Sequence, residues 1–175
     1  MHQSSMLQCA KFVTDYLVNE ETLSIADIGS LDVNGSYRPF FEKTGWTYTG
    51  IDLALGRNVD IVVPELNWNL CSPVDTGSKP LQFDVVISGQ CLEHVRKPWL
   101  WIKDVAAILK PNGLLFLTAP NTWGFHEYPI DCWRIWPDGM RALADEVGLK
   151  EIKCYIYEND TVGIFRNPLH PRKTT

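Results

Sequence analysis

The feature that most constrains the fold is a regular alternation of short apolar runs with longer stretches of helical character. The short runs are rich in Val, Ile, Leu and aromatic residues, which fit a pleated surface. Each is followed by turn or polar residues, so each predicts a strand. Five of them occur before residue 120: Ser24–Ile28, Trp46–Asp52, Val59–Val63, Phe83–Ser88 and Gly113–Ala119. The fifth is apolar on both faces, which is typical of a central parallel strand.

The stretches around these runs predict helices. Four apolar residues at helical spacing, Met6, Ala10, Val13 and Leu17, indicate a helix at the start of the chain. Ser36 is a plausible N-cap for a helix after the first strand, with Pro39 in its first turn. Three further helices are therefore predicted, over Ser36–Lys43, from Pro98 to the LKPNG stretch, and over Pro137–Val147.

The last part of the chain has a different pattern. Two β-rich runs, Glu151–Tyr157 and Thr161–Asn167, flank three turn residues and predict an antiparallel hairpin. Strands that alternate with helices predict a mostly parallel sheet with helices on both faces. We therefore expect a single α/β domain over residues 1–175, with a Rossmann-like, doubly wound, seven-stranded sheet that ends in the antiparallel hairpin.

Composition narrows the class of protein. The net charge is −5 and no basic block occurs, which disfavours nucleic acid as a partner. The five cysteines are scattered and form no CxxC pair, so neither a zinc knuckle nor a redox pair is indicated, no residue is assigned as a metal ligand, and reduced thiols are expected. The N-terminus lacks the features of a signal peptide, and no apolar run is long enough to cross a bilayer. We therefore expect a cytoplasmic protein with no membrane partner.

In sheets of this kind, ligands bind beyond the carboxyl ends of the strands. Gly29 directly follows the first strand, and its missing side chain allows a positive φ or close approach of a ligand. Asp27 and Asp52 lie at the ends of the first two strands, and an acid at the second position binds ribose in dinucleotide folds. The alternative is a capped turn with two solvated carboxylates. Leu31 and Val33 stand where a pyrophosphate-binding loop needs glycine, which argues against a nicotinamide oxidoreductase.

Several stretches in order resemble the class I S-adenosylmethionine-dependent methyltransferases. DIGSLDVNG is similar to the first cofactor loop, and YTGID to the second strand with its ribose-binding acid. FDVVISGQCLEHV is similar to the fourth strand with the helix start after it, and LKPNGLLFLTAPN to the fifth strand. The resemblance covers about Ile25 to Arg166, including the terminal hairpin, and departs from the glycine-rich pattern at Leu31 and Val33.

The resemblance implies that the chain binds S-adenosyl-L-methionine, with S-adenosyl-L-homocysteine as product. Asp27 and Gly29 would lie by the methionine end, Asp52 would bind both ribose hydroxyls, and the end of the fourth strand would border the sulfonium. Leu53 and Leu66 would enclose the adenine, and Glu65 is a candidate for the acid beside it. The implied cofactor-binding residues are Asp27, Gly29, Ser30, Asp52, Leu53, Glu65, Ser88, Gly89 and Gln90.

The long stretch Asn121–Pro137 follows the fifth strand and is too long for a plain connection. Its aromatic and charged residues favour an acceptor pocket. His126 is the candidate general base, with Asp131 to orient it, since an imidazole accepts a proton near neutral pH. The candidate acceptor-binding residues are Tyr128, Trp133 and Arg134. The alternative is an aromatic flap in which Asp131 and Arg134 only staple the loop.

Two further residues, Glu93 and His94, follow the fourth strand. His94 could act as a base near the methyl group, but both residues are interpreted here as part of a helix start, where Glu93 suits the dipole. The expected activity is methyl transfer to a small-molecule or glycan acceptor at oxygen. The competing hypothesis is a catalytically inactive cofactor-binding protein that acts through a partner. A homodimer is one expectation for its assembly.

Overall fold

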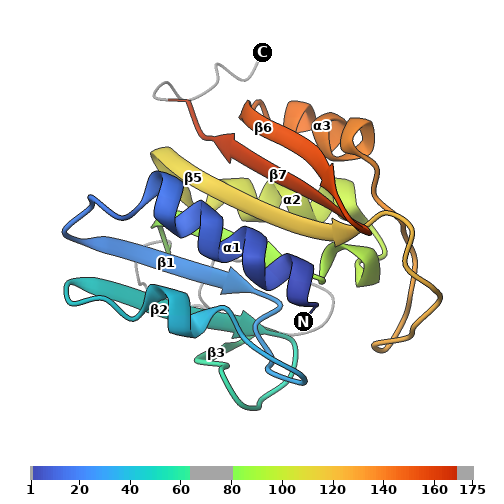
Figure 1. The fold of residues 1–175 in the computed structure, drawn as a ribbon, viewed down its shortest axis with the longest axis horizontal. Coiled ribbons are helices and arrows are strands. Elements are labelled where there is room, and N and C mark those ends of the chain that lie inside the picture. The colour runs from blue at the N-terminus through green and yellow to red at the C-terminus, as the bar shows by residue number, and fades with distance from the viewer. Residues whose placement is uncertain (1, 64–80, 169–175) are drawn as a thin grey trace.

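The strands form one seven-stranded sheet in the computed structural model, which describes residues 2–63 and 81–168. Their order across the sheet is β3-β2-β1-β4-β5-β7-β6 (Figure 1). The strands are β1 (Leu23–Ile28), β2 (Trp46–Asp52), β3 (Ile61–Val62), β4 (Phe83–Gly89), β5 (Leu109–Pro120), β6 (Lys150–Tyr157) and β7 (Asp160–Arg166). The first five pair in parallel, so the predicted parallel sheet is confirmed.

The terminal hairpin is also confirmed. β7 pairs antiparallel with β6 on one side and with β5 on the other. It therefore lies between them and is the one described strand that runs against the rest of the sheet. A hairpin can reverse direction through a short turn, whereas a parallel strand would need a long crossover.

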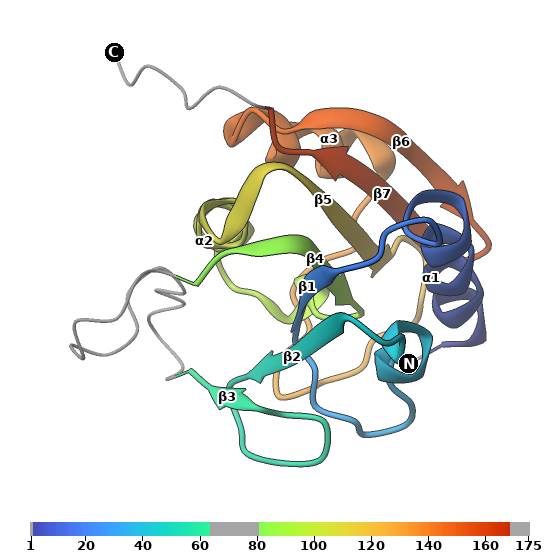
Figure 2. The same ribbon diagram turned by 90° about the vertical axis from the view of Figure 1, so that its left-hand side faces the viewer.

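Helices cover both faces of the sheet, as predicted (Figure 2). α1 (Gln3–Tyr16) lies on one face, and α2 (Pro98–Ala107) and α3 (Pro137–Glu146) lie on the other. A short 3₁₀ helix, η2 (Leu92–His94), follows β4. Within the described ranges, no helix combines the length and the apolar character that a membrane crossing requires.

The predicted helix over Ser36–Lys43 is wrong in type and length, because only the 3₁₀ helix η1 (Arg38–Phe41) forms there. Local side-chain hydrogen bonds occupy the backbone before it. Asp32 Oδ1 accepts the Gly35 N–H (2.8 Å), and Ser36 Oγ accepts the Arg38 N–H (3.1 Å). Such bonds compete with an α-helical start, and Pro39 has no N–H to contribute.

Two apolar layers hold the helices to the sheet. On the α1 face, Phe12 stacks on Phe116 of β5 with ring centroids 4.9 Å apart, and the buried Tyr37 meets Phe116 edge-on. On the other face, Trp101 of α2 and Met140 of α3 pack in the core with Leu115 of β5. Because both faces are covered, the loops at the carboxyl ends of the parallel strands are where a ligand has access. The 121–136 stretch lies at that end of the sheet (Figure 1).

Candidate active site

The loop after β1 needs a glycine at its first position. Gly29 has φ +80°, and its N–H donates to the Ile51 carbonyl (2.9 Å), which ties the loop to the end of β2. A Cβ at Gly29 would lie 2.7 Å from both Cβ and Sγ of Cys91, which follows β4. The loop is therefore pressed against the β4 end of the site, and the next residue, Ser30, is buried there.

Gly29→Ala is expected to lower the free energy of unfolding by about 1–3 kcal/mol, the usual cost of overpacking, with added strain from the positive φ. Urea denaturation measures the change. The control is Gly124→Ala, since a Cβ at Gly124 meets no atom within 4 Å among the described residues. Equal stabilities of the two variants would contradict a packed loop.

Asp27 is a buried acid at the end of β1, and its exposed fraction is 1%. Its Oδ2 accepts a hydrogen bond from the Tyr48 hydroxyl on the neighbouring strand β2. Burial raises the pKa of Asp27 to about 7, and the Tyr48 hydrogen bond opposes that shift. A buried carboxylate needs a hydrogen-bond donor, and here the donor is Tyr48, a residue of the sheet.

This pKa shift makes stability depend on pH. Because the pKa of Asp27 is higher in the folded than in the unfolded state, folding is favoured at low pH, and the contribution is lost as pH rises from about 4 to about 7. Asp27→Asn is expected to remove this loss. The free energy of unfolding should change with pH at different slopes in the variant and the wild type, and the difference in slope should approach but not exceed about 1.4 kcal/mol per pH unit. Thermal or urea unfolding from pH 4 to 8 measures it, with the exposed Asp145→Asn as control; parallel curves for Asp27→Asn and wild type would refute it.

Asp52 lies at the end of β2 and is oriented by backbone amides. Its Oδ2 accepts the Leu31 N–H (2.9 Å), and its Oδ1 accepts the N–H groups of Leu53 (2.7 Å) and Ala54 (3.3 Å). A carboxylate offers about four acceptor positions. One acceptor position therefore remains open to a ligand donor, and the long Ala54 bond is the one that a second donor would most easily replace.

The end of β4 presents backbone rather than side chains to this space. Ser88 Oγ donates to the Ile28 carbonyl (2.7 Å), so its side chain joins β4 to β1. A Cβ on Gly89 would overlap the ring of the buried Tyr37. Gln90 has a positive φ of 55°, and its Nε2 donates to Asp160 (3.0 Å). Glu65 and Leu66 lie outside the described residues.

The loop after β5 is held together by Arg134. Its five N–H donors are all used: two bind Asp131 (2.6 and 2.7 Å), and the others bind the carbonyls of Trp123, Gly124 and Trp133. The Asp131 side chain is only 1% exposed, and Arg134 holds the pKa of that carboxyl well below its usual range. This geometry matches the interpretation of the pair as a loop staple and leaves Arg134 no donor for an acceptor anion.

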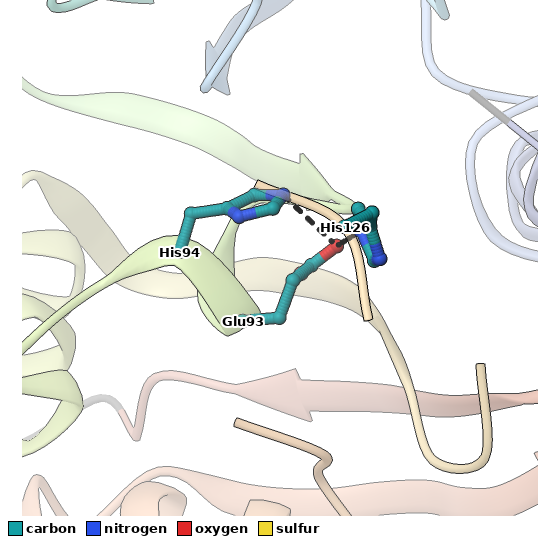
Figure 3. Close-up of side chains that lie close together, drawn as sticks. All are labelled: Glu93, His94 and His126. Carbon is teal, nitrogen blue, oxygen red and sulfur yellow. Dashed lines mark ion pairs between the residues drawn. The ribbon is translucent and has the colours of Figure 1, made fainter. Parts of the chain in front are cut away.

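This staple fixes the position of His126. Asp131 Oδ2 accepts the His126 backbone N–H (2.7 Å) and lies 3.7 Å from its Nδ1. The imidazole turns back over the end of β4, where Nε2 lies 3.8 Å from Oε1 of Glu93 (Figure 3). His94 reaches the same oxygen, with its Nε2 at 3.6 Å. The two imidazoles meet edge-on, 5.1 Å apart.

Glu93 is completely buried at the centre of this cluster. Both its carboxyl oxygens are buried without a hydrogen-bond partner among the described residues. Burial raises the pKa of Glu93 to about 8. A buried carboxyl without donors is costly, so Glu93 points to a function beyond a helix start.

The other two aromatic candidates lie further out on the loop. Tyr128 is 52% exposed, and Trp133 is 37% exposed with its Nε1 donating to the Val95 carbonyl (2.7 Å). Trp133 therefore packs over the segment that follows η2. Its indole covers that segment. Tyr128 is the more exposed of the two side chains and lies in the solvent-facing part of the loop.

Sequence reasoning named Glu93, His94 and His126 separately but did not bring them together. A signal was available, since β4 and β5 were predicted as parallel strands and the loops after neighbouring parallel strands meet at one edge of the sheet. Tyr48 as a partner of Asp27 had a similar signal, because Asp27 and Tyr48 lie on adjacent strands. Their contact depends on the register, in which Asp27 pairs with Gly50.

Comparison with known proteins identifies the family. Residues 8–150 match the family described as a methyltransferase domain. With the fold and the order of the motifs, this match shows that the chain belongs to the class I S-adenosylmethionine-dependent methyltransferases.

Curated relatives are ubiquinone biosynthesis O-methyltransferases. The chain is 26% identical to that of Bartonella tribocorum, over 93% of this chain and 72% of the relative. It is 30% identical to that of Bartonella bacilliformis, over 55% of this chain and 42% of the relative. Among solved structures, the fold is similar to Burkholderia thailandensis 1,6-didemethyltoxoflavin-N1-methyltransferase with bound S-adenosylhomocysteine. The TM-score is 0.68 at 15% identity, over 94% of this chain and 78% of that one.

Proposed function

We propose that this methyltransferase transfers the methyl group of S-adenosyl-L-methionine to an oxygen of a small-molecule acceptor. The observation that supports the proposal most strongly is the Glu93–His94–His126 cluster at the carboxyl end of the sheet. Its two imidazoles lie 3.6 and 3.8 Å from a buried carboxyl, and such a group would accept the proton of an acceptor hydroxyl. The name O-methyltransferase of the curated relatives agrees with transfer to oxygen.

The cofactor would bind across the ends of β1, β2 and β4. Asp52 would accept the ribose hydroxyls and Leu53 would contact the adenine. The main chain at Ser88, Gly89 and Gln90 would border the sulfonium. The sulfonium makes the methyl carbon electrophilic, so the protein mainly has to align the acceptor oxygen with it. Asp27 and the Gly29–Ser30 turn would hold the methionine end.

The acceptor would bind between this cofactor site and the 121–136 loop. His126 is the member of the cluster that an acceptor can reach, because its side chain is 33% exposed and that of Glu93 is 0% exposed. We assign the acceptor proton to the cluster through His126. Asp131 would position His126 through its backbone N–H, and Tyr128 and Trp133 would form the outer wall.

The experiment is a turnover assay that detects S-adenosyl-L-homocysteine formed in the presence of phenols, other small hydroxyl compounds and sugars. We expect product with a hydroxyl compound and a methyl ether in its mass spectrum. Methylation of nitrogen or carbon would overturn the assignment to oxygen, and a sugar product would move the acceptor class to glycans. Cofactor binding by calorimetry without turnover on any acceptor would favour the inactive, partner-dependent protein.

A further inference from the structure

We propose that Glu93, His94 and His126 form a binding site for a divalent transition-metal ion. The three side chains offer one carboxylate oxygen and two imidazole nitrogens, and these ligand atoms all lie within 4.8 Å of one another. They come from η2 and from the loop after β5, and they point toward one another (Figure 3). No residue is assigned as a metal ligand from the sequence, so this inference comes from the tertiary structure alone.

The imidazole tautomers suit a metal ion. His94 Nδ1 contacts the Ile130 carbonyl, and His126 Nδ1 lies 2.9 Å from the Gly124 carbonyl. A carbonyl only accepts, so each Nδ1 carries the proton and each Nε2 presents a lone pair. Both lone pairs face Glu93. Metal-bound histidines are held in this way, with the second ring nitrogen donating to a carbonyl or carboxylate.

With Glu93 ionised, as a metal ligand must be, the centre of the cluster lacks a hydrogen donor. Two imidazole lone pairs and the orphan oxygens of the fully buried Glu93 converge, and none of the described residues donates to them. Acceptors that face one another in a buried space repel unless a cation or a proton lies between them. A divalent ion satisfies all three at once, whereas one proton can bridge only two.

The two distances from the Glu93 carboxylate to the imidazoles require only small adjustments. Oε1 of Glu93 lies 3.6 Å from Nε2 of His94 and 3.8 Å from Nε2 of His126. Two ligands of a tetrahedral ion with bonds of about 2.0–2.1 Å lie roughly 3.4 Å apart. The two imidazole nitrogens lie within 4.8 Å of each other, and His126, which is partly exposed and belongs to a loop, is the ligand that would move to close this distance.

The ligand set also selects the ion. Imidazole suits zinc and its neighbours in the first transition row, whereas Mg²⁺ prefers oxygen ligands. Three protein ligands leave a coordination position open, as in catalytic zinc sites. If the proposed function holds, an acceptor hydroxyl could occupy that position, where its pKa would fall and it would release its proton to solvent. His126 would then act as a ligand rather than as the direct base. The metal site itself does not depend on any acceptor.

The test uses untagged, reduced protein without cofactor or acceptor, so a negative result leaves the methyltransferase function untouched. Co²⁺ is titrated and followed by its visible d–d absorption, and Zn²⁺ binding is measured by calorimetry and thermal unfolding. We expect one ion per chain, a raised melting temperature and displacement of Co²⁺ by Zn²⁺. Millimolar Mg²⁺ should leave the Co²⁺ spectrum unchanged.

Variants separate this site from adventitious binding. Glu93→Gln keeps the shape of a buried side chain, and His126→Ala changes a loop residue, so loss of folding in one leaves the other as a test. Each should lose at least about tenfold in Zn²⁺ affinity. Glu127→Gln and His2→Ala serve as matched controls, and Cys132→Ser excludes binding by the exposed thiol. All three should bind Zn²⁺ as the wild type does.

Absence of Co²⁺ absorption and of Zn²⁺ heat in the folded wild type would overturn the proposal. Equal Zn²⁺ affinity in Glu93→Gln, His126→Ala and the wild type would overturn it as well. Displacement of Co²⁺ by Mg²⁺ would overturn the choice of a transition metal. Loss of binding in Cys132→Ser alone would assign the ion to the thiol and reject the cluster.

Discussion

Turnover on an oxygen acceptor is expected to fall about a hundredfold or more when His126 is replaced by alanine. The imidazole is the accessible member of the Glu93–His94–His126 cluster, and its Nε2 points at the buried carboxyl 3.8 Å away. Removal of the imidazole takes away the route by which the acceptor hydroxyl loses its proton. The result is expected whether the side chain acts as a base or as a metal ligand. The measurement is the rate of S-adenosyl-L-homocysteine formation at saturating cofactor.

The neighbouring substitution Glu127→Ala is the control for this experiment, because it changes the same loop without touching the cluster. It should keep most of the wild-type rate. His126→Ala should also bind the cofactor with unchanged affinity, since His126 is assigned to the acceptor side. Full turnover in His126→Ala would refute a role in the reaction. A parallel loss of cofactor affinity would instead show that the 121–136 loop shapes the cofactor site.

Affinity for the cofactor is expected to fall about 10- to 150-fold in Asp52→Ala. Hydrogen bonds to a charged group contribute about 1.5–3 kcal/mol each, and Asp52 is the carboxylate that we assign to the ribose. Its orientation is fixed in advance by the Leu31 and Leu53 amides, so little ordering is required on binding. Calorimetric titration with S-adenosyl-L-homocysteine measures the change without turnover.

Asp52→Asn separates the contribution of the negative charge from that of the hydrogen-bond acceptors. It keeps one carbonyl acceptor for the Leu31 or Leu53 N–H and removes the charge, so an intermediate affinity is expected. Circular dichroism should show the wild-type spectrum for both variants. Wild-type affinity in Asp52→Ala would remove Asp52 from the ribose site, and the β2 end would then need another acceptor for the hydroxyls.

The strands were predictable because their signal is local. The FDVVIS run needs only its own residues to indicate a buried strand, and β4 forms over Phe83–Gly89. The same holds for the terminal hairpin, whose short turn determines the antiparallel pairing. The 36–43 segment shows the limit of local reasoning. The side-chain hydrogen bonds of Asp32 and Ser36 compete with an α-helix there, and only a short 3₁₀ helix forms.

The meeting of Asp27 and Asp52 at one edge of the sheet was predictable for a related reason. In a parallel sheet, Asp27 and Asp52 must reach the same edge, so their residue types already indicate a cofactor site there. The roles of Arg134 and Glu93 were not predictable in this way. Whether any of the five Arg134 donors remains free depends on how the loop folds back on itself, and three carbonyls of that loop and the Asp131 carboxylate take all five.

The sequence by itself determined the order of strands and helices, the family and the edge of the sheet that carries the site, because each depends on periodicity or on short motifs. Only the tertiary structure decided that His126, from the loop after β5, meets Glu93 and His94, from the turn after β4. These residues are 33 and 32 positions apart in the chain. Their contact requires β4 and β5 to be neighbours and the Asp131–Arg134 pair to fold the loop inward over the buried Glu93. Each condition is a relation between distant segments, and no local pattern in the sequence encodes it.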